Sequence, residues 1–352
     1  MLKIVQHKKI YVGIALALVI ASIVSLLIQG FALDTDFAGG TAITYTVSEK
    51  VTEDEVRALV KEAFGKDASM VRITGENIDI EVGHDTKLSD KENVEKANAA
   101  IEVLNHKVAE KWGKLSVIVD ENGAPITATG AATTDQKFEN TKLYTEITAE
   151  EANKQVISHE GYSYFVEGVA KSELNVVSSS TARNLAKSAV VMSILAAIAI
   201  LIYVAIRFDF TSGVCAVIAL AHDIIVLCGI YSVLRIKIDT NFIAALLTVL
   251  GYSINNTIVI FDRIRENTRR ARKETYSEIA NASINSTLKR SINTTITTLL
   301  TIGAVYVLGV SSIKVFALPI IIGILVGTYS SIFVSGSIWA TWKDAAVKNK
   351  RK

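Results

Sequence analysis

An aspartate and a histidine lie at the centre of an otherwise apolar stretch of this chain. The run Gly213–Leu234 is long enough to cross a bilayer, and it contains His222 and Asp223. An ionised carboxylate at that depth costs about 2.5–3.5 kcal/mol on insertion scales, so it persists only when it is paired, neutralised or hydrated. Those conditions also suit a group that carries protons. We therefore predict that Asp223 gains and loses a proton; the alternative is a permanently neutral acid that only ties helices together. For His222, a direct role and simple packing at a helix contact both stay open.

Further polar side chains occur in the next apolar stretches. Asn256 and Arg263 are seven residues apart and share one helix face, and Asp262 lies on the adjacent face. A stripe of hydroxyls follows at helical spacing, formed by Thr294, Thr297, Thr298 and Thr301. This stripe predicts hydrogen bonds to Asp223 and Asn256 or a narrow wet path. The alternative is that each threonine bonds to its own helix backbone.

The composition is typical of a membrane protein with a water-soluble part. Hydrophobic residues make up 50% of the chain and charged residues 20%. Six apolar windows have the roughly twenty residues that a bilayer requires. They are Ile10–Ile28, Ser188–Ile206, Gly213–Leu234, Phe242–Phe261, Ile292–Val310 and Val315–Trp339. One span therefore precedes a long polar segment, and five follow it as a block.

Charge predicts the orientation. Residues 31–182 hold 27 acidic and 15 basic residues, so the small overall charge is an average that gives no indication of nucleic-acid binding. With the N-terminus inside, 17 basic residues flank the inner ends of the spans and five the outer ends. We therefore expect both termini to be cytoplasmic and the acidic domain to lie outside. A cleaved signal peptide is the alternative for the first span, but its length and the poor cleavage sequence Gln29–Ala32 favour a retained anchor.

These observations divide the chain into four segments. Residues 1–30 are the cytoplasmic start and first span, 31–182 the extracytoplasmic domain, 183–342 the five-helix block and 343–352 a basic tail. Within the block, the basic loop 262–291 predicts an amphipathic helix that contacts anionic membrane lipids. Gly323 and Gly327 in the last span, with Ser330, Ser331 and Ser335 after them, predict close helix packing without chemistry.

The outer domain alternates strand and helix patterns. Strands are expected at 41–47, 70–74, 78–82 and 115–119, and helices follow capping boxes at Thr52 and Ser89. The order predicts an α+β, ferredoxin-like sheet with an insertion at about 115–160. In the insertion we expect a strand near 144–148 and a helix over 149–159, and after it strands near 164–169 and 174–178. The domain's histidines, His84, His106 and His159, have no metal-ligand spacing, so we expect no catalytic set, cofactor or metal, and no enzyme.

Three motifs, with the 1+5 arrangement of spans, resemble the SecF members of the SecD/SecF family, which belongs to the resistance-nodulation-division (RND) superfamily. They are Leu33–Thr41, which includes Asp36, Phe37, Gly39 and Gly40; Ala221–Asp223; and Gly251–Asn267. Two positions depart from the family pattern: Asp34 replaces a glycine, and Asn256 stands where many members have an acid. Because an amide does not titrate, the second departure puts a proton role for position 256 in doubt.

The resemblance implies a subunit of the bacterial cytoplasmic (inner) membrane that uses the proton-motive force to promote protein export through the Sec pathway. It implies a SecD-like subunit, the SecYEG channel and a translocating polypeptide as partners, and a moving outer domain joined to the first span by the glycine motif. An RND-type half-transporter for a small molecule or lipid is the alternative. An intramembrane hydrolase would need a second carboxylate at the depth of Asp223, and a purely structural scaffold would not need Asp223 to titrate.

Overall fold

The computed structural model describes residues 3–85, 87–119, 137–138, 156–159, 162–309 and 311–350. These form two compact units. One comprises Met1–Leu33 with Lys187–Lys352, and the other comprises Asp34–Ala186.

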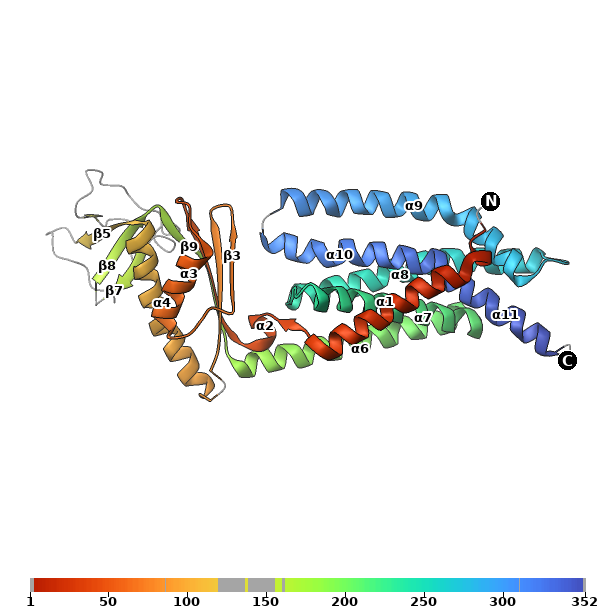
Figure 1. Cartoon of the computed structure of the whole chain (residues 1–352), viewed down its shortest axis with the longest axis horizontal. Coiled ribbons are helices and arrows are strands. Elements are labelled where there is room, and N and C mark those ends of the chain that lie inside the picture. Colours follow the sequence, from red (N-terminus) through yellow and green to blue (C-terminus); the bar gives the residue numbers. More distant parts are fainter. Residues whose placement is uncertain are drawn as a thin grey trace. The chain divides into compact units, whose positions relative to one another are not determined.

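The first unit is built from long helices (Figure 1). The chain's long helices are α1 (Lys8–Gln29), α6 (Ser179–Arg207), α7 (Phe210–Val233), α8 (Thr240–Arg270), α9 (Tyr276–Leu308), α10 (Ser311–Tyr329) and α11 (Gly336–Lys350). Within the described residues, six helical segments are long and apolar enough to cross a membrane: Val5–Gln29, Ser179–Arg207, Phe210–Val233, Thr240–Arg270, Tyr276–Leu308 and Ile313–Lys348. Each overlaps one predicted window, which confirms the multi-pass helical architecture.

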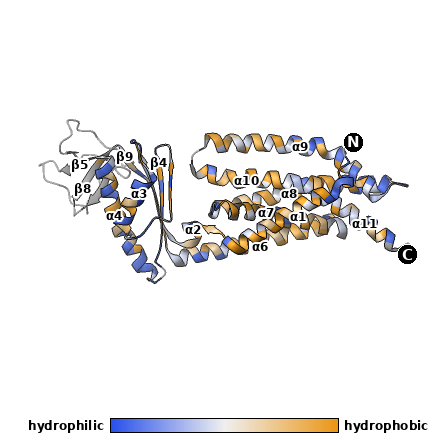
Figure 2. Cartoon of the chain, in the orientation of Figure 1, coloured by the Kyte–Doolittle hydropathy of each residue, from blue (hydrophilic) through white to orange (hydrophobic). Residues whose placement is uncertain are grey.

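Burial separates inner from outer helices in this unit. About half of the apolar window of α7 and of α8 is buried, against 11% for α6 and α9. Figure 2 shows hydrophobic residues along the helices of this unit. Apolar side chains on poorly buried helices suit a lipid or partner environment, whereas α7 and α8 provide the interior in which a polar site is protected from lipid.

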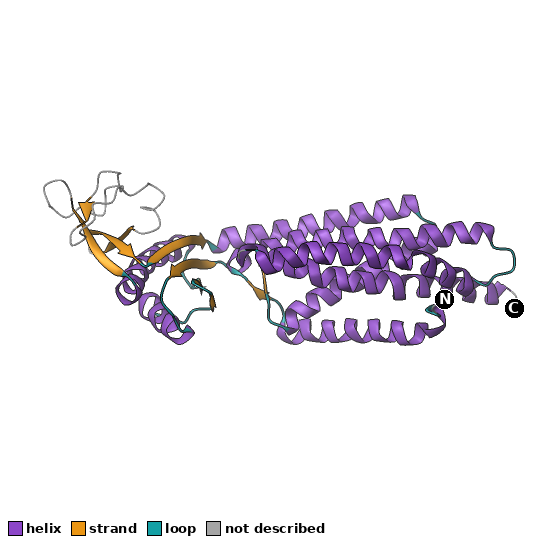
Figure 3. Ribbon diagram, turned by 90° about the horizontal axis from the view of Figure 1, so that it is seen from above, coloured by secondary structure: helices purple, strands orange, loops and turns teal. Residues whose placement is uncertain are grey.

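Small residues bring the inner helices close together. A Cβ added at Gly323 of α10 would lie 2.3 Å from Val249 of α8, and one added at Gly229 of α7 would lie 2.1 Å from Ser22 of α1. The close packing predicted for Gly323 is therefore confirmed. In the described residues of this unit, strands are limited to the parallel pair β1 (Ala32–Leu33) and β10 (Lys237–Ile238) (Figure 3).

The basic segment 262–291 differs from its prediction. It is not a separate amphipathic helix: α8 continues to Arg270 and α9 begins at Tyr276, with only residues 271–275 between them. A capping box at Thr275 and Glu278 starts α9. The polar segment 262–291 therefore consists mainly of the end of α8 and the start of α9, which extend beyond the apolar parts of these helices. The end of the chain likewise continues as α11.

The second unit contains a four-stranded antiparallel sheet. Its elements are α2 (Thr35–Ala38), β2 (Gly40–Val47), α3 (Glu53–Phe64), β3 (Met70–Thr74), β4 (Asn77–Gly83), α4 (Asp90–Trp112) and β9 (Val169–Val177). The strand order is β3-β4-β2-β9. Both predicted capping boxes are present, at Thr52 and at Ser89. Apolar residues of this sheet and of α3 and α4 form one core, including Ile43, Ile80 and Leu104.

A second sheet occupies the insertion. It has the order β6-β5-β8-β7, formed by β5 (Lys114–Val119), β6 (Lys137–Phe138), β7 (Val156–His159) and β8 (Tyr162–Glu167). The helix expected over 149–159 is wrong at its end, because β7 pairs with β8 there. The expected strand near 144–148 lies outside the described residues.

Candidate proton-carrying site in the helical unit

Asp223 lies in the interior of the helical unit with only 1% of its surface exposed. Its Oδ2 accepts hydrogen bonds from Ser253 Oγ of α8 and from Ser330 Oγ, at 2.9 Å for the latter. Its Oδ1 lies 2.9 Å from His222 Nδ1. Three polar groups from different parts of the chain therefore surround one carboxyl group, which is how a buried acid becomes tolerable among apolar helices.

The last span approaches this carboxyl group closely. A Cβ added at Gly327 of α10 would lie 3.0 Å from Ser253 Cβ and 3.5 Å from Asp223 Oδ2. The absence of a side chain at Gly327 thus lets α10 approach α8 and places Ser330 beside the carboxyl group. The interpretation that these small residues serve packing alone is therefore incomplete.

A π-helical turn, η2 (Ser330–Ser335), follows α10 at this point. The wider turn carries fully buried serines, of which Ser331 lies 2.9 Å from Thr257 of α8. Single π turns within α-helices occur often at functional sites, because they insert one residue and re-aim the side chains. Here the turn directs hydroxyls towards both Asp223 and α8.

Four buried side-chain atoms of this unit have no hydrogen-bond partner among the described residues. Ser337 Oγ and Trp339 Nε1 are on α11, whereas His222 Nε2 is on α7 and Asn256 Nδ2 is on α8. Buried polar atoms normally have a hydrogen-bond partner, so a buried atom without one needs a specific explanation, such as a functional role. His222 on α7 and Asn256 on α8 therefore each retain an unused hydrogen-bonding atom in the interior.

The predicted threonine stripe does not reach Asp223. Thr294, Thr297, Thr298 and Thr301 each donate to the carbonyl four residues earlier in α9. The expected hydrogen bonds to Asp223 and Asn256 are therefore absent from the described contacts, and the backbone-bonding alternative is what the structure has. The physical reason is that these four lie on the exposed or half-buried side of α9.

Thr295, which the predicted stripe does not include, is buried in the same part of α9. Its Oγ1 lies 2.9 Å from Thr328 Oγ1 of α10 and accepts a hydrogen bond from Tyr252 of α8. Thr295 therefore connects three helices through hydroxyl groups. The sequence does not distinguish Thr295 from the four neighbouring threonines, because all five are the same residue type on one helix.

Arg263 and Asp262 make contacts of their own. Arg263 donates to Glu266 at 2.6 Å and to Ser286 of α9 at 3.1 Å. Asp262 accepts from Arg207 of α6 at 2.7 Å. Both acid–base pairs are more than one third exposed. The described hydrogen bonds of Arg263 do not include Asp223.

The junction motif is well defined within the second unit. Asp34 caps the short helix α2 by accepting from the Thr35 N–H, which gives this unusual residue a structural use. Gly39 and Gly40 then have φ of 76° and 152°. A Cβ on Gly40 would lie 2.7 Å from the Val82 carbonyl oxygen, so only glycine fits there. Asp36 and Phe37 belong to α2, and the side chain of Phe37 is half-buried.

Comparisons with known proteins agree with this architecture. The family model described as "Protein export membrane protein SecD/SecF, C-terminal" matches residues 161–345. The protein translocase subunit SecF of Petrotoga mobilis is 29% identical over 334 residues, which cover 95% of this chain and 93% of the relative. The protein translocase subunit SecDF of Thermus thermophilus is 51% identical over 145 residues, which cover 41% of this chain and 20% of the relative.

A solved structure is also similar. The crystal structure of SecDF from Thermus thermophilus, described as a translocon-associated membrane protein, aligns with a TM-score of 0.69 at 30% identity, over 97% of this chain and 38% of that one. The chain thus spans well under half the length of these SecDF proteins. The six long apolar helices of the described residues, together with these matches, make it a multi-pass protein of the bacterial inner membrane. The chain belongs to the SecD/SecF family of protein-export membrane proteins.

Proposed function

We propose that this chain is a SecF-type accessory subunit of the Sec translocase. With a SecD-like partner, it uses the proton-motive force to promote export of polypeptides through a SecYEG channel. The observation that carries the proposal is the buried Asp223 carboxyl group, which is held by Ser253, Ser330 and His222 inside a membrane-spanning bundle. The relatives named as protein translocase subunits support the export role.

In this mechanism Asp223 alternates between protonated and ionised forms. The ionised form accepts hydrogen bonds from Ser253 and Ser330, whereas the protonated form donates one itself and needs fewer donors. Because Ser253 is on α8 and Ser330 is on the π-helical turn, a change in protonation changes how strongly these two elements are held to α7. One charge moved through 100 mV supplies about 2.3 kcal/mol, enough to bias two positions by about fiftyfold.

The proton route contains several groups in addition to Asp223. His222 and Asn256 have the unpartnered buried atoms near the centre, and Asp262 and Arg263 lie in half-exposed pairs near the proposed cytoplasmic end. We leave the four threonines of the stripe out of this route, since their hydroxyls bond to their own helix.

The second unit is proposed as an extracytoplasmic, ferredoxin-like lever, with both termini of the chain cytoplasmic. The order β3-β4-β2-β9, with α3 and α4 in the two β-α-β crossovers, supports a split β-α-β sheet. The distribution of basic residues supports the orientation. Gly39 and Gly40 lie where α2 meets β2, and both have positive φ, a backbone conformation that other residues rarely adopt.

The same proposal assigns no catalytic activity, cofactor or metal to the chain. Basic residues near the ends of α8 and α9 would face anionic lipid headgroups. A small-molecule half-transporter is not favoured, because the relatives are named as protein translocase subunits.

Replacing Asp223 by asparagine in cells that depend on this chain tests the proposal. We expect precursors of secreted proteins to accumulate while the chain and its SecD-like partner assemble normally. The control is Asp344→Asn, which removes an acid that contacts Ser277 and not the central site. Normal export with D223N would favour a scaffold role.

A further inference from the structure

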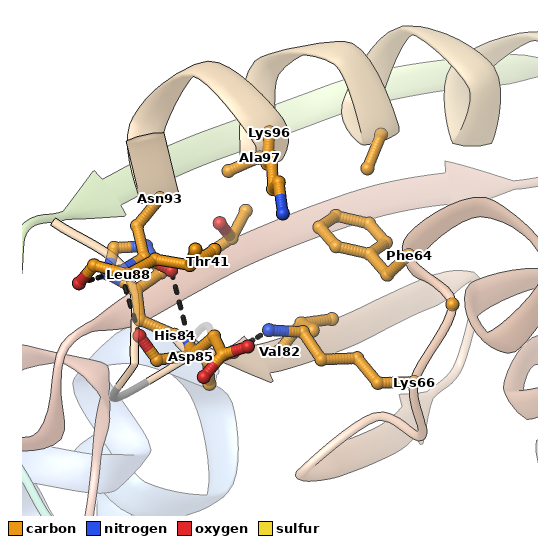
Figure 4. Close-up of a pocket in the computed structure, with 13 residues that line it drawn as sticks. Thr41, Phe64, Lys66, Val82, His84, Asp85, Leu88, Asn93, Lys96 and Ala97 are labelled. Carbon is orange, nitrogen blue, oxygen red and sulfur yellow. Dashed lines mark hydrogen bonds between the residues drawn. The ribbon is translucent and has the colours of Figure 1, made fainter. Parts of the chain in front are cut away.

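A cavity of about 300 Å³ opens in the second unit. It lies between the end of α3, the end of β4 and the first turns of α4. Figure 4 shows Lys66 and Lys96 reaching into it from two sides, with Phe64 between them. Its volume is at the lower end for ligand sites and matches one or two side chains.

The cavity carries more positive than negative charge. Lys66 is half-buried, and its Nζ donates to the Gly83 carbonyl oxygen, while Lys96 stands at the exposed rim. Burial lowers the pKa of Lys66; the charge of Asp85 opposes this shift and the charge of Lys96 adds to it. Two lysines against one aspartate leave one net positive charge in an otherwise acidic domain.

Buried polar atoms in the cavity lining have no partner among the described residues. Thr41 is 1% exposed, and its Oγ1 has no hydrogen bond. Both ring nitrogens of His84 are also buried without a partner. Burial, followed by the charge of Lys66, lowers the pKa of His84, so its ring stays neutral near pH 7 and keeps one donor and one acceptor. Thr41 and His84 can each donate one hydrogen bond, and these unused donors lie beside a net positive charge, so an anionic group would complete the site.

We propose that this cavity binds a carboxylate group of a polypeptide, with Lys66, Lys96, Thr41 and His84 as its donors. A singly charged carboxylate balances the single net positive charge of the lining. The apolar part, formed by Phe64, Val82, Ala97 and Ala100, accommodates the methylenes of a glutamate side chain or the last residue of a chain.

The source of the carboxylate rests on the proposed export function, since an exported polypeptide would pass the outer domain. Thr41 directly follows the junction glycines, so an occupant would contact the strand that leads from the first span. Binding itself does not require Asp223 to titrate. A D223N variant that binds the ligand but does not export therefore separates the two proposals.

The test uses the full chain in zwitterionic lipid nanodiscs, with binding measured by calorimetry. The probes are acetyl-Ala-Glu-Ala-amide, the same peptide with glutamine, acetyl-Ala-Ala-Ala with a free carboxyl end, and inorganic phosphate. We expect the glutamate peptide to bind at least about tenfold more tightly than the glutamine peptide, because each hydrogen bond to a charged group contributes that much. The free-carboxyl peptide distinguishes a chain terminus from a side chain as the preferred source.

Two variants and one control complete the test. Lys66→Gln is expected to weaken glutamate-peptide binding by about tenfold or more. The control is Lys61→Gln, in the last turn of α3, which is 66% exposed and paired with Asp67, and which is expected to leave binding unchanged. Thr41→Val is expected to weaken binding while raising thermal stability, because it removes a buried unpartnered hydroxyl. Equal binding of the glutamate and glutamine peptides, binding of phosphate alone, no binding, or unchanged binding by K66Q and T41V would each overturn the proposal.

Discussion

Replacing Gly327 by alanine tests whether the close approach of the last span positions Asp223. The added Cβ would lie 3.0 Å from Ser253 Cβ, 3.2 Å from Ser253 Oγ and 3.5 Å from Asp223 Oδ2. Ser253 must then move back by a few tenths of an ångström. This movement lengthens the hydrogen bond that Ser253 donates to the carboxyl group.

Folding and function are expected to respond differently to this change. The added methyl group costs about 1 kcal/mol, the lower end of the range for overpacking, and alanine gains about 1 kcal/mol over glycine inside a helix. The free energy of unfolding therefore stays close to that of the wild type. A hydrogen bond to a charged group contributes about 1.5–3 kcal/mol, so losing half of it lowers gradient-driven export by about three- to tenfold.

Two other glycines provide matched controls. A Cβ on Gly323, one turn earlier in α10, would lie 2.3 Å from the Val249 side chain, so Gly323→Ala costs about 2 kcal/mol of stability after the helix gain. A Cβ on Gly251 would meet nothing within 4 Å, so Gly251→Ala is neutral or stabilising. The expected order of stability is G251A, then G327A, then G323A.

The assay combines thermal unfolding of the purified chain with export measured per folded molecule. Only G327A is expected to lose export per folded molecule, because only its methyl group displaces Ser253, which donates a hydrogen bond to Asp223. If G327A folds and exports like the wild type, the close approach of α10 does not position the carboxyl group. If G323A shows the same defect per folded molecule, general packing explains both.

Three further predictions concern the hydroxyls of α9 and the outer domain. Thr301→Val should leave export unchanged, because the Thr301 hydroxyl bonds to its own helix. Thr295→Val should lower the free energy of unfolding by about 1 kcal/mol, because Thr295 bonds to two other helices. Export assays check the first expectation and thermal unfolding checks the second. Because the pKa of His84 is lowered in the folded domain, the unfolded chain takes up the proton first as pH falls. The contribution of neutral His84 to the free energy of unfolding is thus fully present above about pH 6.5 and is lost as pH falls through the lowered pKa of the folded domain. His84→Gln should make this free energy less dependent on pH, as measured by hydrogen exchange of the β4 amides. Gly40→Ala should disrupt the start of β2, because its Cβ would lie 2.7 Å from Val82 O, and proteolysis of the outer domain should rise.

Sequence patterns with local causes predicted much of the fold. The six spans depend on length and hydropathy, and the helices that begin after Thr52 and Ser89 depend on capping boxes four residues long. The helix expected over 149–159 failed at β7, where Val156 and Ile157 pair with β8. That pairing is a tertiary contact, which a pattern read along the chain does not contain.

The site could be predicted only in part, for the same reason. An acid in an apolar run marked Asp223 without any knowledge of its neighbours. Ser253 and Ser330 could not be assigned to it, because their contacts depend on how α7, α8 and the π-helical turn meet. Helical spacing identified a threonine face on α9 but not which face is buried, so Thr295 was missed and Thr297 was overrated.

The most direct measurement is gradient-stimulated export in vesicles that contain the full chain, its SecD-like partner and the channel. With an imposed proton gradient, the wild-type chain should accelerate release of a secretory protein, and D223N should leave only the rate seen without the gradient. Full stimulation of D223N by the gradient, in vesicles with equal amounts of assembled complex, would contradict a proton-carrying role for the Asp223 carboxyl group.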